Sequence, residues 1–161
     1  MKIICISLIG VALLAGSAAG ASKGGSVSLV AYSTPKDAYG KIISAFQKTS
    51  AGSGTDFSQS YGASGDQARA VAAGQDADLV ALSLDPDVNL LVGKGLVPKN
   101  WAANSHRGIV SDSVVVFVVR DGNPKKIRGW GDLVKPGVQV INPNPFTSGG
   151  ARWNVMAAYG A

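Results

Sequence analysis

The sequence has a single cysteine, Cys5, and a single histidine, His106, in 161 residues. Cys5 lies ahead of the N-terminal apolar run, whereas the lipid-bearing cysteine of a lipoprotein would follow that run. Once this segment is removed the chain has no thiol, which excludes disulfides and thiolate chemistry. One imidazole without a cysteine also argues against a metal site of the zinc type. His106 lies in a polar loop whose spacing does not suggest a Ser-His-Asp triad.

Long apolar runs are also absent. Residues 3–15 are apolar, but this run is too short to span a bilayer. It follows the basic start Met1-Lys2 and precedes an A-x-A motif at Ala19–Ala21. This pattern is typical of a secretory signal peptide, here residues 1–21, with cleavage before Ser22. We therefore predict an exported protein, the alternative being a retained membrane anchor.

Charge is sparse, at 16% of residues, with a formal net charge of +5. The basic residues are scattered, and only Asn123–Arg128 forms a cluster, which suits either an acidic partner or a solvated turn. A protein that binds nucleic acid would show a denser basic stripe with interleaved aromatic residues, so no nucleic-acid partner is predicted. A mild positive charge still raises the local concentration of small anions.

Short apolar strands alternate with segments of helical spacing. Strands are predicted at residues 26–32, 55–61, 78–82, 113–120 and 138–141. The run at 113–120 is rich in Val and Phe, as in strands buried on both faces. Helices are predicted to begin at Pro35 with Thr34 as N-cap, near Gly62, at Pro86 and at Ala151, with a helical turn at 129–134. This alternation predicts an α/β fold with a largely parallel sheet.

Three loops share one pattern, in which a strand ends, a hydroxyl residue follows and a helix begins. The hydroxyls are Ser33, Ser64 and Ser148, and the last is followed by Gly149 and Gly150. The carboxyl ends of parallel strands face a common crevice, where helix N-termini present N–H donors to a ligand. The pattern therefore predicts an anion site. The alternative is helix capping alone, which the Ser64-x-x-Gln67 capping box favours for Ser64 and the adjacent glycines disfavour for Ser148.

Other chemistry has weaker signals. Four carboxylates lie in a short stretch, at Asp76, Asp78, Asp85 and Asp87. A strand and a helix are predicted to start there, which favours a structural role for these side chains over a cation site. The Ser148-Gly-Gly loop lacks the Gly-Lys-Ser/Thr of a phosphate-binding P-loop. We predict no catalytic residues, no metal and no cofactor.

The chain contains one distinctive motif, Pro143-Asn-Pro-Phe-Thr-Ser-Gly-Gly-Ala-Arg-Trp153. Five weaker motifs precede it along the chain: Ala31–Ser33, Tyr61–Ala68, Ala77–Val80, Phe117–Pro124 and Trp130–Gly137. In this order the motifs resemble those of the periplasmic sulfate-binding proteins of sulfate/thiosulfate ABC importers. The resemblance runs from about Ser26 to the last residue.

The resemblance implies a two-lobed periplasmic-binding-protein-like fold of type II that closes on a dehydrated oxyanion. The family's ligand groups correspond here to Ser64, to Ser148 with its two glycines, and to the loop around Ser33. Members often carry Asp at the position of Ser33 and Lys at that of Asp66, so these two departures bear on the strength and selectivity of the site. We expect a first lobe over residues 22–118 and an incomplete second lobe over 119–161, so that the chain corresponds to an N-terminal part of the family.

The implied function is a monomeric solute-binding subunit, not an enzyme, that captures sulfate or thiosulfate and delivers it to the membrane subunits of an ABC importer. Two alternatives stay open at this point. One is a binding protein for another oxyanion, such as molybdate or phosphate. The other is a secreted hydrolase of phosphate or sulfate esters, for which the sequence shows no nucleophile with a base.

Overall fold

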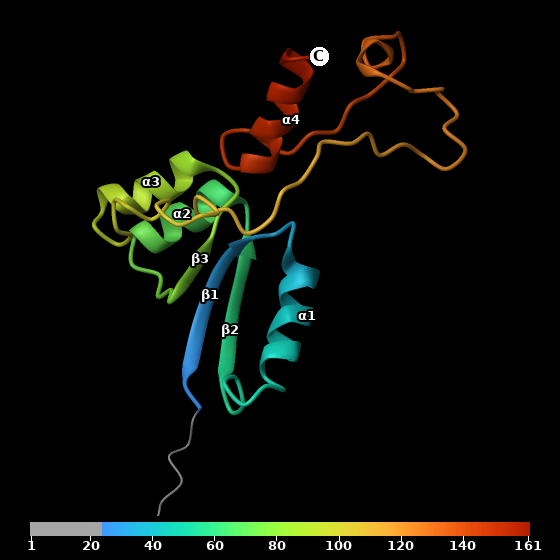
Figure 1. Ribbon diagram of the computed structural model, residues 1–161. Helices are drawn as coiled ribbons and strands as arrows, with labels where there is room; N and C mark the ends of the chain where they lie inside the picture. The colour runs from blue at the N-terminus through green and yellow to red at the C-terminus, as the bar shows by residue number, and fades with distance from the viewer. Residues whose placement is uncertain (1–23) are drawn as a thin grey trace, which may run out of the picture.

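The computed structural model describes residues 24–161, so the predicted signal peptide lies outside the described residues. Strands and helices alternate over the first half, as predicted, and end with a helix after a long irregular segment (Figure 1). The elements are β1 (Ser26–Tyr32), α1 (Lys36–Phe46), β2 (Asp56–Gly62), α2 (Ser64–Ala72), β3 (Leu79–Ala81), α3 (Asp85–Gly93), the 3₁₀ helix η1 (Trp130–Asp132) and α4 (Gly149–Tyr159).

The three strands form a parallel sheet in the order β2-β1-β3. β1 is central and pairs along its whole length with β2, from Ser26 opposite Asp56 to Tyr32 opposite Gly62. Its second half also pairs with β3. All three strands therefore end at the same edge of the sheet, which is the arrangement that brings their following loops together.

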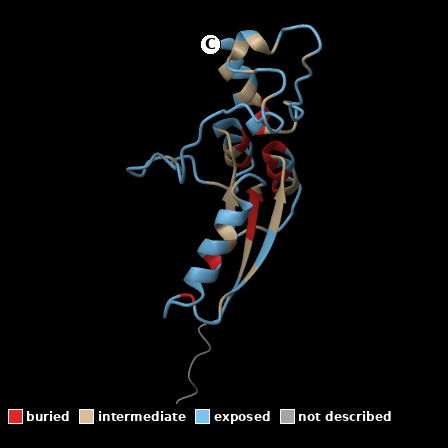
Figure 2. Ribbon diagram, turned by 90° about the vertical axis from the view of Figure 1, so that its right-hand side faces the viewer, coloured by how far each residue is buried: buried red, intermediate tan, exposed pale blue. Residues whose placement is uncertain are grey.

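Helices cover both faces of the sheet. On one face, Leu29 and Ala31 of β1 contact Ile43 of α1. On the other face, Val30 contacts Val71 of α2 and Leu91 of α3, and these residues are among the most buried in the chain (Figure 2). Alternate residues of β1 thus point to opposite cores, which explains why this strand is apolar almost throughout.

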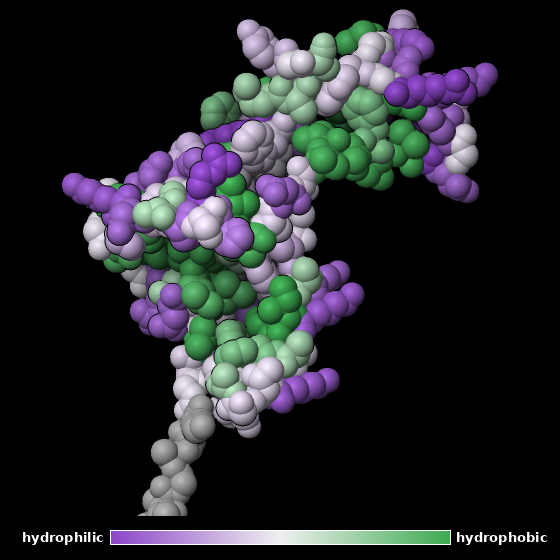
Figure 3. All heavy atoms as spheres, viewed as in Figure 1, coloured by the Kyte–Doolittle hydropathy of each residue, from purple (hydrophilic) through white to green (hydrophobic). Residues whose placement is uncertain are grey.

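Two predicted strands are wrong. Residues 113–120 and 138–141 are irregular, and their apolar side chains are exposed, Val118 at 93% and Ile141 at 98%. Within residues 24–161 the backbone of these segments has no neighbouring strand to pair with. A strand is stabilised only by such pairing, so apolar composition alone did not make one. The exposed side chains form part of the hydrophobic surface in Figure 3.

Two details of helix α1 also differ from the prediction. The helix begins at Lys36, with Pro35 as N-cap and no side-chain cap from Thr34. Of the apolar residues expected on its inner face, Ile43 is buried, whereas Ile42 is 58% exposed. Phe46 lies at the edge of the core, where it meets Phe57 of β2 edge to face. α1 therefore covers its side of the sheet with a narrower stripe than its spacing predicts.

Candidate functional site

Helix α4 lies beyond the carboxyl ends of the strands, with its N-terminus against the starts of α2 and α3 (Figure 1). Two hydrogen bonds hold it there. The N–H of Gly65 donates to the carbonyl of Thr147 (3.0 Å), and Nε1 of Trp153 donates to the carbonyl of Ser83 (3.1 Å). Segments 70 or more residues apart in the sequence thus meet at the edge where the parallel strands end.

Ser148 and the two glycines after it offer three donors at the N-terminus of α4. Ser148 is the N-cap, and its Oγ accepts a hydrogen bond from the N–H of Ala151 (3.2 Å). Acceptance leaves the hydroxyl proton free to be donated. The N–H groups of Gly149 and Gly150 have no hydrogen-bond partner in the described part of the chain. Capping and anion binding are therefore compatible at Ser148.

Gly149 is buried because the β3–α3 loop takes the place of a side chain. A Cβ at this position would lie 2.1 Å from Oγ of Ser83 and 2.9 Å from Cγ of Leu84. At Gly150, by contrast, a Cβ would meet only Ser148 Oγ, at 3.7 Å. Packing therefore requires a glycine at position 149. No contact within residues 24–161 requires one at position 150.

Ser64 is buried at the first turn of α2, but it does not cap that helix. The N-cap is Ala63, and Ser64 Oγ donates to Oδ2 of Asp87 (2.6 Å) and accepts from the N–H of Ser83 (2.9 Å). The capping-box interpretation is therefore wrong. The hydroxyl proton already has an anionic acceptor inside the fold, so Ser64 differs from Ser148, whose proton is free.

Ser83 and Asp87 are the residues at this edge that the sequence reasoning missed as members of the site. A signal existed for Ser83, since it follows the third strand and precedes a helix, as Ser33 and Ser64 follow the first and second strands. Asp87 was considered only as one of four clustered carboxylates. It is buried at 7% exposure at the start of α3, where the helix dipole favours its negative charge.

Ser33 lies at the end of β1, beside the end of β2. Its N–H and its Oγ both donate to the carbonyl of Gly62, each at 3.0 Å. The side chain is exposed, so a lone pair of Oγ remains open to solvent while its proton is used. The structure therefore brings Ser33 to the predicted edge but gives its hydroxyl a backbone partner.

Asp66 forms an exposed ion pair with Arg69 one turn later on α2. The guanidinium offsets the negative charge near the start of the helix. Because the pair is exposed, solvent screens it, and its net effect on the site is small.

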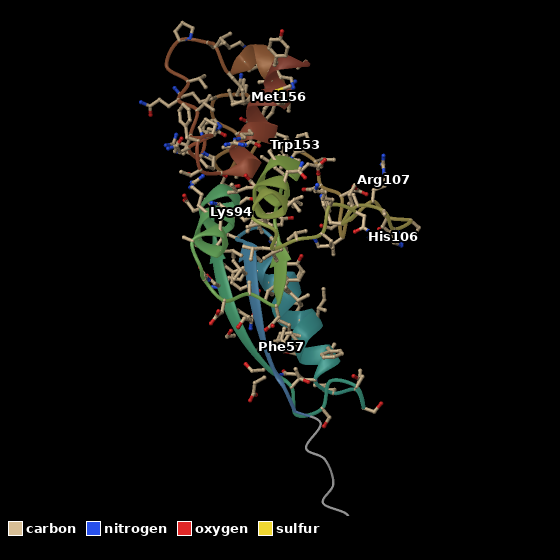
Figure 4. The ribbon with its side chains drawn as sticks, turned by 90° about the vertical axis from the view of Figure 1, so that its left-hand side faces the viewer. Phe57, Lys94, His106, Arg107, Trp153 and Met156 are labelled. Carbon is tan, nitrogen blue, oxygen red and sulfur yellow. The ribbon has the colours of Figure 1, made fainter. Side chains whose placement is uncertain are left out.

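The remaining candidates lie elsewhere. His106 and Arg107 extend on a loop away from the strand ends (Figure 4). Among residues 24–161 there is no cluster of three or more side chains suited to hold a metal ion. No helix in this part of the chain is long and apolar enough to cross a membrane.

Comparisons with known proteins agree on one family. Residues 27–161 match the bacterial extracellular solute-binding proteins. The chain is 46% identical to a sulfate-binding protein of Synechococcus elongatus, over 87% of this chain and 43% of that protein. It is 37% identical to a thiosulfate-binding protein of Pseudomonas aeruginosa, over 99% of this chain and 49% of that protein.

A solved structure is similar as well, that of the sulfate-binding protein SubI from Mycobacterium tuberculosis H37Rv. It superimposes with a TM-score of 0.80 at 50% identity and covers 82% of this chain and 46% of its own. The chain thus spans less than half the length of these relatives.

Proposed function

The chain belongs to the bacterial extracellular solute-binding proteins, and we propose that it is part of a protein that captures sulfate or thiosulfate for an ABC importer. The predicted α/β fold of the periplasmic-binding-protein type is confirmed by the similarity to a solved sulfate-binding protein. The family name places such proteins outside the cytoplasm. A periplasmic location after removal of residues 1–21, and the boundary between lobes near residue 118, belong to this proposal.

The observation that carries the proposal is the N-terminus of α4. The Ser148 hydroxyl proton and the N–H groups of Gly149 and Gly150 have no partner among the described residues, and they lie at the helix N-terminus, where the helix dipole is positive. A helix N-terminus contributes about half a positive charge, and hydrogen bonds to a charged acceptor are stronger than those between neutral groups. Such a site binds an anion without a cationic side chain.

A site built from donors favours a fully ionised oxyanion. Sulfate and thiosulfate near neutral pH carry only acceptors, so every N–H and O–H that meets them is satisfied. Phosphate brings its own proton, which would face other donors and lose a hydrogen bond at a cost of ~1–3 kcal/mol. Sulfate is therefore expected to bind more tightly than phosphate.

The test is isothermal titration calorimetry of the full-length protein, of which this chain is proposed to be a part, with sulfate, thiosulfate, molybdate and phosphate under identical salt conditions. Saturable binding of sulfate or thiosulfate, with phosphate weaker by about tenfold or more, supports the proposal. Binding of molybdate or phosphate in preference to both would assign the site to another oxyanion. The absence of binding to all four would refute an oxyanion-binding role.

The binding proteins named by the comparisons argue for transport over catalysis. We infer that the chain supplies ligand capture, and that the partner is the membrane part of an importer rather than a nucleic acid. No observation favours the hydrolase alternative, because no hydroxyl at the strand ends contacts a histidine or lysine base in residues 24–161. Incubation with an aryl sulfate and an aryl phosphate, with product release measured, checks this directly.

A further inference from the structure

Ser83 carries a buried hydroxyl group that has no hydrogen-bond partner. Its Oγ is the one buried side-chain oxygen or nitrogen left unpaired among residues 24–161. The backbone around it is fixed on both sides, because its N–H donates to Ser64 Oγ and its carbonyl accepts from Trp153 Nε1. Figure 4 shows Trp153 on α4 beside α3, next to this loop. The hydroxyl is therefore held in place without being satisfied.

The unpaired hydroxyl lies at the candidate anion site. Gly149, the first residue of α4, approaches so closely that a Cβ there would meet Ser83 Oγ at 2.1 Å. Gly149 also carries one of the unpaired N–H groups at the helix start. An unpaired buried hydroxyl costs free energy, and native proteins keep such groups mainly where they serve a function. Two independent observations thus point to the same place.

We propose that Ser83 is a further ligand-binding residue, whose hydroxyl donates to the oxyanion held at the N-terminus of α4. This inference rests on the proposed function. In the absence of ligand the proton has no acceptor within reach. A bound dianion beside Gly149 supplies one, so the group that is unfavourable in the empty site becomes favourable in the filled site. The loop after the third strand then contributes a donor, the Ser83 hydroxyl, to the same site as Ser148.

The experiment compares Ser83→Ala with wild type in the full-length protein by two measurements, sulfate titration by calorimetry and urea unfolding without sulfate. We expect the affinity to fall about ten- to a hundredfold, as for loss of a hydrogen bond to a charged group. The unfolding midpoint of the ligand-free protein is expected to stay the same or to rise, because the variant removes an unsatisfied polar group. A residue with a purely structural role would not give this combination.

Ser58→Ala is the matched control, since Ser58 on β2 also carries a hydroxyl but bonds to Ser28 Oγ, away from the strand ends. It should leave the affinity unchanged. Ser83→Cys keeps the size of the side chain while weakening the donor, and it should also lose affinity. Wild-type affinity in Ser83→Ala or Ser83→Cys would overturn the inference while leaving the proposed function intact.

Two other outcomes also decide against it. Marked destabilisation or unfolding of ligand-free Ser83→Ala would show that the hydroxyl is paired within the fold. A full-length wild-type protein that binds no oxyanion would refute the proposed function, and the assignment of Ser83 with it.

Discussion

Replacing each of the two adjacent glycines of α4 by alanine should have opposite effects on stability. Gly149 is buried against the β3–α3 loop, whereas Gly150 is exposed. Neither has a positive φ angle, so alanine is compatible with the backbone at both positions. The two substitutions make the same chemical change one residue apart, and they differ only in what the new methyl group meets.

The magnitudes follow from the surroundings of each Cβ. At position 150 a Cβ would meet only Ser148 Oγ, at 3.7 Å, which is an ordinary van der Waals contact. Gly150→Ala should therefore stabilise the chain by ~0.4–1 kcal/mol through reduced entropy of the unfolded state. At Gly149 the methyl group would lie 2.1 Å from Ser83 Oγ and 3.1 Å from Leu84 Cδ1. Overpacking of this kind costs ~1–3 kcal/mol.

The assay is equilibrium unfolding in urea, with m-values compared to confirm that both variants unfold from the same compact state. Because the entropy gain is common to both variants, the difference between them isolates the overpacking and should be ~1–3 kcal/mol, with Gly149→Ala the less stable. Equal stability of the two variants would refute the reasoning, since it would mean that α4 does not contact the β3–α3 loop in solution.

Three further predictions concern single side chains. In the full-length protein, Ser148→Ala should weaken sulfate binding about ten- to a hundredfold in calorimetry. Ser148→Gly, which costs the helix cap only a few tenths of a kcal/mol, should lose the same affinity, so wild-type affinity in the glycine variant would return Ser148 to capping alone. Ser64→Ala should destabilise the chain by ~1–3 kcal/mol in urea unfolding, because it leaves the buried carboxylate of Asp87 without its donor; a neutral effect would show that water replaces the hydroxyl. The hydrogen bond from Lys135, with two backbone N–H groups, lowers the pKa of Asp132 to about 2. Its contribution to stability is present above the ordinary carboxyl pKa and is lost as the pH falls through about 2, so an NMR titration of the Asp132 carboxyl should show a midpoint well below the ordinary value.

Local sequence determined the elements of the first half of the chain. β1 matches its predicted range of residues 26–32, and β2 and α3 lie within one residue of theirs. These elements depend on side-chain periodicity and on helix start and stop signals, both of which lie within a few neighbouring residues. The same local information placed Ser33 and Ser64 after strands and Ser148 at the start of a helix.

Tertiary structure decided which of these hydroxyls has a free proton. The sequence favoured capping for Ser64 and ligand binding for Ser148, yet Ser148 caps its helix and Ser64 does not. The acceptor for Ser64 is Asp87, twenty-three residues away in the sequence. No local pattern contains that partner, because a hydroxyl bonds to whichever acceptor the packing of two helices brings within reach.

The same reason explains the two strands that did not form and the role of Gly149. Residues 113–120 have the composition of a buried strand, but a strand also requires a partner backbone, which a sequence pattern does not supply. Gly149 looked like a residue that lets a ligand approach, and in the structure it first accommodates Ser83. Periodicity and capping act over a few residues and can be read along the chain. Pairing, burial and hydrogen bonds between distant segments depend on how the elements come together in space.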